Sequence, residues 1–185
     1  MSAAAKVLVE GRPGSGKTTV VAGLAELLAQ RGVEVRGFVT HELREGGRRV
    51  GFEVETVAGQ RATLAHVGFS GPPRVGRYGV DLDAFEGIAL PALEDPPRNG
   101  VVLIDELGKM ELASQRFREA VSALFDADLA LIAAVHVFRD PFTDRLKRRP
   151  DVERVQVRRD NRDELPARLA DRLGSGLAMT HERKT

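Results

Sequence analysis

A glycine-rich stretch near the amino terminus has the residue types and spacing of a phosphate-binding loop. Residues 11–18 read GRPGSGKT and match the pattern G-x-x-x-x-G-K-[ST]. Glycines let such a backbone curl, so that several N–H groups point at phosphate oxygens. The lysine supplies a cation for the β- and γ-phosphates, and the following hydroxyl is a ligand for Mg²⁺. The expected nucleotide-binding residues are Gly11, Arg12, Pro13, Gly14, Ser15, Gly16, Lys17, Thr18 and Thr19.

A second motif, VVLIDE at residues 101–106, is an apolar run that ends in two carboxylates. Asp105 would end a buried strand, at the sheet edge where nucleotide sites form in open α/β folds. There it is placed to hold Mg²⁺ together with Thr18. A glutamate at the next position can orient a water molecule and accept its proton during attack on the γ-phosphate. A kinase gains nothing from such a group, because water would then compete with its acceptor. We therefore interpret Lys17 and Glu106 as catalytic residues of a hydrolase.

The residues alone leave two other functions open. A nucleotide or nucleoside kinase would explain the arginines of RLKRRP (145–150), which could clamp acceptor phosphates or form a solvated basic face. A switch-like nucleotide-binding module would explain DELG, which fits the D-x-x-G of GTPases. The base-reading motif N-K-x-D is only approximated by NRDE (161–164), and we interpret Asn161 or Asp160 as the cap of the last helix.

Composition narrows the class of protein further. The chain has 185 residues, 42% of them hydrophobic and 30% charged, with a net charge of +1 and no cysteine. Disulfides and thiolate metal sites are therefore excluded, and no overall field attracts nucleic acid or an anionic membrane. Aromatic residues make up 5% and tryptophan is absent, which also argues against single-stranded nucleic acid. The four histidines are scattered. His136, at a strand end, could face the γ-phosphate, although a histidine in that position is more often structural. We expect a cytoplasmic monomer whose partner is the nucleotide substrate.

Apolar runs alternate with amphipathic helices along the chain, which is typical of a mostly parallel α/β sheet covered on both faces. We expect one domain over residues 1–173 and a frayed tail over 174–185. Two alternating segments around the turn AGQ predict an antiparallel hairpin near 48–67, followed by a loop at 68–77. Strands are expected at 6–10, 33–40, 101–106, 129–135 and 152–157, and helices at 16–30, 81–93, 114–125, 143–148 and 162–173.

The distances of the two carboxylates from the γ-phosphate predict the order of the strands. Asp105 and Glu106 must lie at different distances from the γ-phosphate. A strand inserted beside the phosphate-loop strand moves the carboxylates outward by about 4.8 Å, which leaves room for a water. We predict that LALIAAV (129–135) is that strand, because its unbroken apolar run suits a strand buried on both faces.

Taken together, the motifs resemble a family of small nucleoside-triphosphatases of thermophile origin, also called the cancer-related NTPase family. The resemblance covers nearly the whole chain and is carried by GRPGSGKTT, GGRRVGFEV, VGRYGVDL and IDELGKME. It implies slow, Mg²⁺-dependent hydrolysis of NTP to NDP and phosphate with broad base tolerance. It also implies a three-layer phosphate-loop fold of the additional-strand, catalytic-glutamate division.

Carried over by position, the resemblance makes Asp105 the Mg²⁺-side aspartate and Glu106 the catalytic glutamate. Lys109 lies in GKME, where it either reaches the γ-phosphate or pairs with a neighbouring carboxylate such as Glu111. The chain departs from the family pattern at HVFRDPFTDRLKRR, so Arg139 and Arg145 are weak candidates for charge neutralisation.

Overall fold

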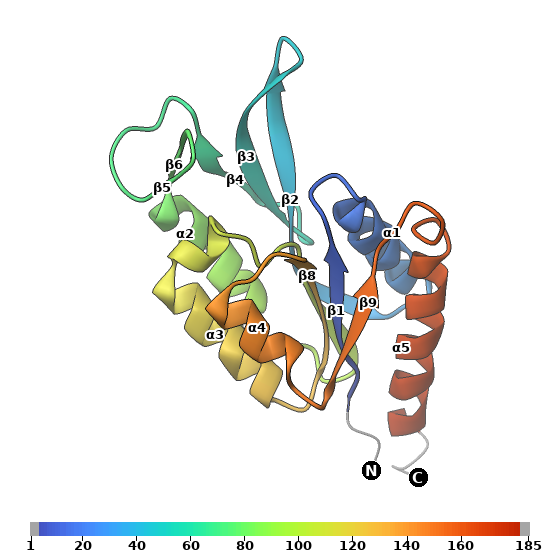
Figure 1. The fold of residues 1–185 in the computed structure, drawn as a ribbon. Helices are drawn as coiled ribbons and strands as arrows, with labels where there is room; N and C mark the ends of the chain where they lie inside the picture. The colour runs from blue at the N-terminus through green and yellow to red at the C-terminus, as the bar shows by residue number, and fades with distance from the viewer. Residues whose placement is uncertain (1–3, 182–185) are drawn as a thin grey trace.

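A single nine-stranded sheet forms the centre of the computed structural model (Figure 1), which describes residues 4–181 and the side chains of residues 4–173. Its strand order is β5-β6-β4-β3-β2-β7-β8-β1-β9. The strands from β2 to β9 in this order run parallel to one another, and the other strands are antiparallel. The parallel strands are β1 (Lys6–Gly11), β2 (Glu34–Glu45), β7 (Gly100–Ile104), β8 (Ala130–His136) and β9 (Val152–Gln156).

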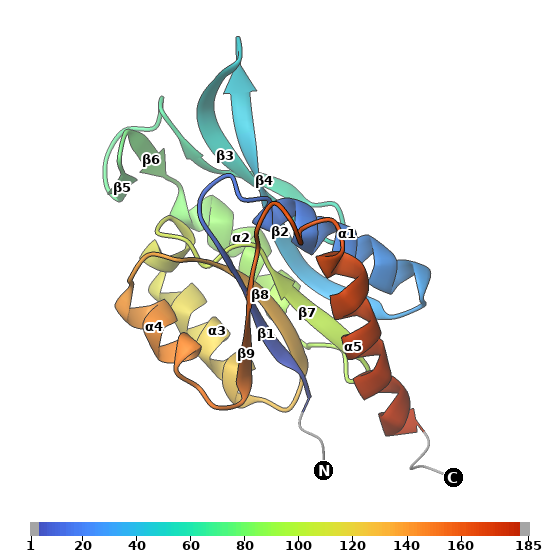
Figure 2. The same cartoon turned by 45° about the vertical axis from the view of Figure 1, so that its right-hand side comes forward.

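Helices cover both faces of the parallel part of the sheet, which gives the three layers expected (Figures 1 and 2). Helices α1 (Lys17–Gln30) and α5 (Leu165–His181) share one face and pack over Val7, Val9 and Ile132. On the other face lie α2 (Leu82–Leu93), α3 (Gln115–Asp126) and α4 (Pro141–Lys147), whose core includes Phe38, Phe85 and Phe117. A 3₁₀ turn, η1 (Glu111–Ala113), precedes α3. No helix in the described part of the chain combines the length and the apolar run that crossing a bilayer requires.

The predicted position of LALIAAV is confirmed. β8 pairs in parallel with β1 on one side and with β7 on the other, so the phosphate-loop strand and the carboxylate strand do not touch. Residues 130–135 of β8 are all buried, as an unbroken apolar run requires.

The predicted hairpin is confirmed and is part of a larger antiparallel extension. β3 (Arg48–Thr56) pairs with β4 (Arg61–His66), and β3 also pairs with the second half of β2. β2 therefore continues to Glu45, beyond the predicted end at residue 40, and projects with β3 away from the body of the molecule (Figure 1). The segment expected to be a loop contains β5 (Arg74–Val75) and is followed by β6 (Tyr78–Val80).

Helix boundaries differ from the prediction mainly at the carboxyl-terminal end. Asp81 caps α2 by accepting from the Ala84 amide at 2.9 Å. The expected cap of the last helix is wrong: α5 begins at Leu165, and the Asn161 side chain is bound to the backbone of the preceding turn. α5 continues past residue 173 to His181, into the segment expected to fray, and residues 182–185 lie outside the described part.

Candidate active site

The phosphate loop connects the end of β1 to the start of α1. Gly14 and Gly16 have φ angles of 74° and 98°, a backbone conformation that glycine adopts without strain. A Cβ atom on Gly11 would lie 2.3 Å from Oγ of Ser15, so the loop folds back closely on its own first residue. The Lys17 ammonium group donates to the carbonyl oxygens of Gly11 at 3.2 Å and Arg12 at 3.4 Å. The loop thus keeps its lysine curled over the backbone that would hold phosphate.

Glu106 lies between this lysine and a histidine from the neighbouring strand. Its Oε2 atom is 3.6 Å from Nζ of Lys17, and its Oε1 atom is 2.6 Å from Nε2 of His136. Burial pushes the pKa of Glu106 upward, but the hydrogen bond from His136 and the charges of His136 and Lys17 outweigh it. The pKa of Glu106 therefore lies below its usual value, and the carboxylate is ionised at neutral pH.

The inserted strand β8 is what brings these groups together. His136 is the last residue of β8 and lies opposite Gly11 in the β1–β8 register. On the other side, the Leu107 amide donates to the Ala134 carbonyl of β8 at 2.9 Å, which fixes the backbone just after Glu106. Of the two interpretations of His136, the structure favours a position at the phosphate site, since its ring contacts the proposed base directly.

Asp105 is completely buried, and among the described residues neither of its carboxylate oxygens has a hydrogen-bond partner. Burial raises its pKa to about 7, the Thr18 hydroxyl opposes this rise without reaching hydrogen-bond geometry, and the charge of Glu106 adds to it. A buried carboxylate without partners is costly unless a ligand satisfies it. With the Thr18 hydroxyl beside it, this donor set of hard oxygens fits Mg²⁺.

A second buried carboxylate supports the loop that follows β7. Glu111 is 3% exposed, and Thr40 donates to its Oε1 atom at 3.4 Å and to the Asp105 carbonyl at 2.7 Å. Burial and the charge of Glu106 raise the pKa of Glu111 to about 8. Lys109 is exposed, and within residues 4–173 no ion pair joins it to Glu111 or to any other carboxylate.

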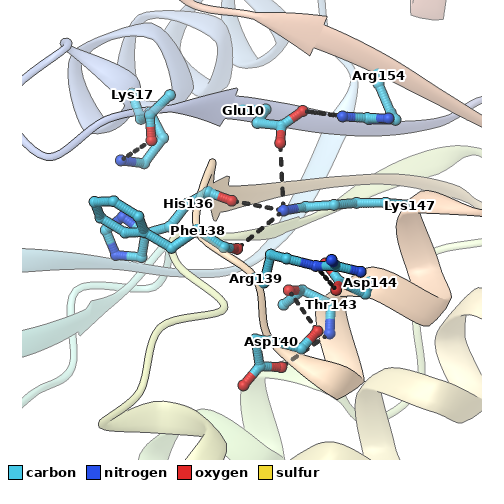
Figure 3. A network of polar contacts seen from close by, with 11 residues as sticks. Glu10, Lys17, His136, Phe138, Arg139, Asp140, Thr143, Asp144, Lys147 and Arg154 are labelled. Atoms are coloured by element: carbon cyan, nitrogen blue, oxygen red, sulfur yellow. Dashed lines mark hydrogen bonds and ion pairs between the residues drawn. The ribbon is translucent and has the colours of Figure 1, made fainter.

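Behind the site, a buried ion pair holds the segment that carries His136 (Figure 3). The Lys147 side chain, 8% exposed, lies 3.3 Å from Oε1 of Glu10 and donates to the His136 carbonyl at 2.7 Å. It also reaches the Phe138 carbonyl at 3.5 Å, and Arg154 binds the other oxygen of Glu10 at 2.8 Å. Lys147 therefore anchors the backbone after β8 and is not part of a solvated basic face.

The remaining arginine candidates lie apart from Lys17 and Glu106. Arg139 is 92% exposed and pairs with Asp144 at 3.5 Å, and the Arg145 guanidinium lies over the ring of Phe142 at 5.6 Å. Arg149, one of the possible phosphate clamps, is bound to Asp126 and Asp151 at 2.6 and 2.9 Å. Arg145 and Arg149 thus make local structural contacts, which weakens the argument for a kinase.

The fold is that of a phosphate-loop protein of the catalytic-glutamate type. Its glycine-rich loop joins β1 to a helix, and β8 separates β1 from β7, the strand that the two carboxylates follow. The chain belongs to the NTPase family, whose sequence profile matches residues 6–170.

Relatives support this membership over nearly the full chain. "Nucleoside-triphosphatase THEP1" of Thermofilum pendens is 45% identical over 181 residues, covering 95% of this chain and 99% of the relative. The crystal structure of THEP1 from the hyperthermophile Aquifex aeolicus matches with a TM-score of 0.82 and 31% identity, covering 91% and 98% of the two chains. The solution structure of a human cancer-related nucleoside triphosphatase matches with a TM-score of 0.80 and 37% identity, covering 93% and 98%.

Proposed function

We propose that this protein hydrolyses nucleoside 5′-triphosphates to nucleoside diphosphate and phosphate, with Mg²⁺ as cofactor and with broad tolerance for the base. The observation that supports hydrolysis best is the position of Glu106. Its ionised carboxylate lies 3.6 Å from the phosphate-loop lysine, where it can accept a proton from a water beside the γ-phosphate. The names of the relatives, nucleoside-triphosphatases, agree with this chemistry.

In the proposed reaction, a water oxygen forms a bond to the γ-phosphorus while the bond from that phosphorus to the bridging β–γ oxygen breaks. Glu106 takes the proton of the water, and His136 holds the carboxylate in place through its 2.6 Å contact. Lys17 and the backbone amides of the loop bind the β- and γ-phosphates and offset the charge that collects on the leaving diphosphate. Thr18 and Asp105 would hold Mg²⁺, which supplies further positive charge to the same oxygens.

Phosphate release without an added acceptor tests this proposal directly. We expect turnover with ATP, GTP, CTP and UTP when Mg²⁺ is present and loss of turnover when a chelator removes it. Turnover that appears only when a nucleoside or nucleoside monophosphate is added would identify a kinase instead. Tight nucleotide binding with negligible turnover would identify a switch-like module.

A comparison of the four bases tests the proposed tolerance. A site that requires one hydrogen-bonding edge can reject analogues by roughly 10⁴–10⁵ in kcat/KM. We expect much smaller ratios among the four triphosphates. A hundredfold preference for GTP would contradict broad tolerance and would favour NRDE as a base-reading motif.

A further inference from the structure

In the proposed function, Lys17 and Glu106 lie at the terminal phosphate of the nucleotide. The arrangement of the strands then restricts where the nucleoside can lie. Lys17 and Glu106 meet above β8, which adjoins β1 on one side. The other neighbour of β1 is β9. A nucleoside triphosphate is an extended chain of atoms. With its γ-phosphate at Glu106 and its β-phosphate in the loop, the nucleoside extends toward the end of β9 and the start of α5.

The segment at that place, residues 157–164, is a well-braced turn. The Val157 amide donates to the Glu10 carbonyl at 2.8 Å, which ties the turn to β1. Asn161 accepts from the Arg158 amide at 2.8 Å and donates to the Gln156 carbonyl at 2.9 Å. Figures 1 and 2 both show this connection beside the first turn of α1.

Arg162 is the residue of this turn that reaches the phosphate loop. Its Cδ atom lies 3.4 Å from the position of a Cβ atom built on Gly16, the residue that begins α1. Its side chain is 46% exposed, and its recorded ion pair is with Asp163 at 3.5 Å, a carboxylate that is itself 89% exposed. The side chain therefore passes the start of α1, and the partner of its guanidinium group is an exposed carboxylate of the same turn.

We propose that the Arg162 side chain forms the surface on which the nucleobase stacks. This inference rests on the proposed function, since it names the part of the same site that receives the nucleoside. An arginine guanidinium is planar and stacks on aromatic rings. Stacking uses the face of a base, which every base has, so it can bind all four without reading their hydrogen-bonding edges.

The state of Asn161 explains why the turn would not read base edges. Both polar atoms of its side chain amide are bound to the backbone of the turn itself. Each atom keeps one further hydrogen-bonding position, but the two bonds fix the direction in which the amide points, so it would not rearrange to follow different base edges. Recognition then depends on stacked area, and purines should gain more from Arg162 than pyrimidines do.

Binding experiments on three variants test the inference. Arg162→Ala removes the stacking surface, Arg162→Lys keeps the charge without the planar group, and Arg159→Ala removes an exposed charge from the same turn as a control. The probes are the non-hydrolysable imidotriphosphate analogues of the four nucleotides and inorganic tripolyphosphate, measured by calorimetry with Mg²⁺. Tripolyphosphate carries the phosphates without a nucleoside, so it separates the two kinds of contact.

We expect Arg162→Ala to weaken the purine analogues about tenfold and the pyrimidine analogues less. Tripolyphosphate binding should not change, Arg162→Lys should not restore the purine affinity, and Arg159→Ala should match the wild type. An equal loss for tripolyphosphate, or full rescue by lysine, would show a phosphate contact and overturn the inference. Unchanged purine affinity would place the nucleoside elsewhere. Because these measurements need no turnover, failure of the proposed hydrolysis would be seen separately, as absence of phosphate release by the wild type.

Discussion

At the scale of single residues, the proposed hydrolysis depends on Glu106. The variant Glu106→Gln keeps the shape of the side chain but cannot accept a proton. We expect turnover to fall by about 10²–10⁴-fold, the usual cost of losing a general base. Affinity for a non-hydrolysable NTP analogue should stay close to that of the wild type, and Glu94→Gln, an exposed carboxylate elsewhere, serves as the control. Near-normal phosphate release by Glu106→Gln would end the assignment.

The structure bears on the two roles considered for Lys109, an ion pair with Glu111 or a contact with the γ-phosphate. Lys109 is exposed and, within residues 4–173, is not paired with Glu111, which is buried in the 3₁₀ turn that follows. That leaves the lysine available to approach the γ-phosphate when nucleotide is bound. We expect Lys109→Ala to lower kcat with little change in nucleotide affinity, because a group that acts mainly on the transition state affects turnover more than binding. A variant with wild-type kinetics would show that the lysine has no catalytic part.

The residues of the phosphate loop and the carboxylate pair could be identified from sequence because each motif is local. The contacts of His136 with Glu106 and of Lys147 with Glu10 could not be predicted from the sequence. The contact of His136 with Glu106 depends on the register of β8 between two strands that are distant in the sequence. Lys147 lies in a basic run, and lysines are almost never buried unless paired. Its partner Glu10 comes from the opposite end of the chain, so no local pattern indicates the pair.

At the scale of elements, ion pairs at the amino-terminal edge of the sheet tie β9 to β1. Asp151, just before β9, binds Lys6 of β1 at 3.1 Å and Arg149 at 2.9 Å. These partners, Arg149 first, hold the pKa of Asp151 well below its usual value. A carboxyl whose pKa is depressed in the folded state stabilises the fold above its unfolded pKa, near 3.9. That stabilisation is lost as the pH falls below this value.

Asp151→Asn should therefore cost about 1 kcal/mol in the free energy of unfolding at neutral pH, a modest value because the carboxylate is partly exposed. The difference from wild type should shrink as the pH is lowered below about 4, where the wild-type unfolded state is itself protonated. Urea unfolding at several pH values measures this, with Asp160→Asn, an exposed carboxylate in the β9–α5 turn, as the control. A cost that stays constant down to low pH would show that charge is not its origin.

Most elements were predictable because apolar periodicity and capping residues mark them. The second half of β2 was not, since HELRE (41–45) has no apolar alternation to indicate a strand. It is a strand because its backbone pairs with β3 over Glu42 and Leu43, a contact made across the hairpin. The short strands β5 and β6 were missed for a similar reason, because glycine and proline dominate the segment and pairing alone defines them.

At the scale of the whole molecule, one chain supplies every group assigned to the proposed reaction. Lys17 and His136 of the same chain both contact Glu106. Specific activity should therefore stay constant when the protein concentration is varied widely, which a phosphate-release assay can measure against a sedimentation profile of the same samples. A steep rise of specific activity with concentration would mean that a second copy completes the site.

The position of β1 has a consequence for synthesis on the ribosome. β1 is made almost first, but its two neighbours in the sheet, β8 and β9, begin at Ala130 and Val152. Until those segments emerge, the strand that leads into GRPGSGKT has no partner to pair with, and such long-range pairing is slow to form. A nascent chain that has been translated only through residue 128 would hold all of its phosphate-binding residues and still lack a nucleotide site. Nucleotide binding should therefore begin only after the chain has been translated through β8 and β9.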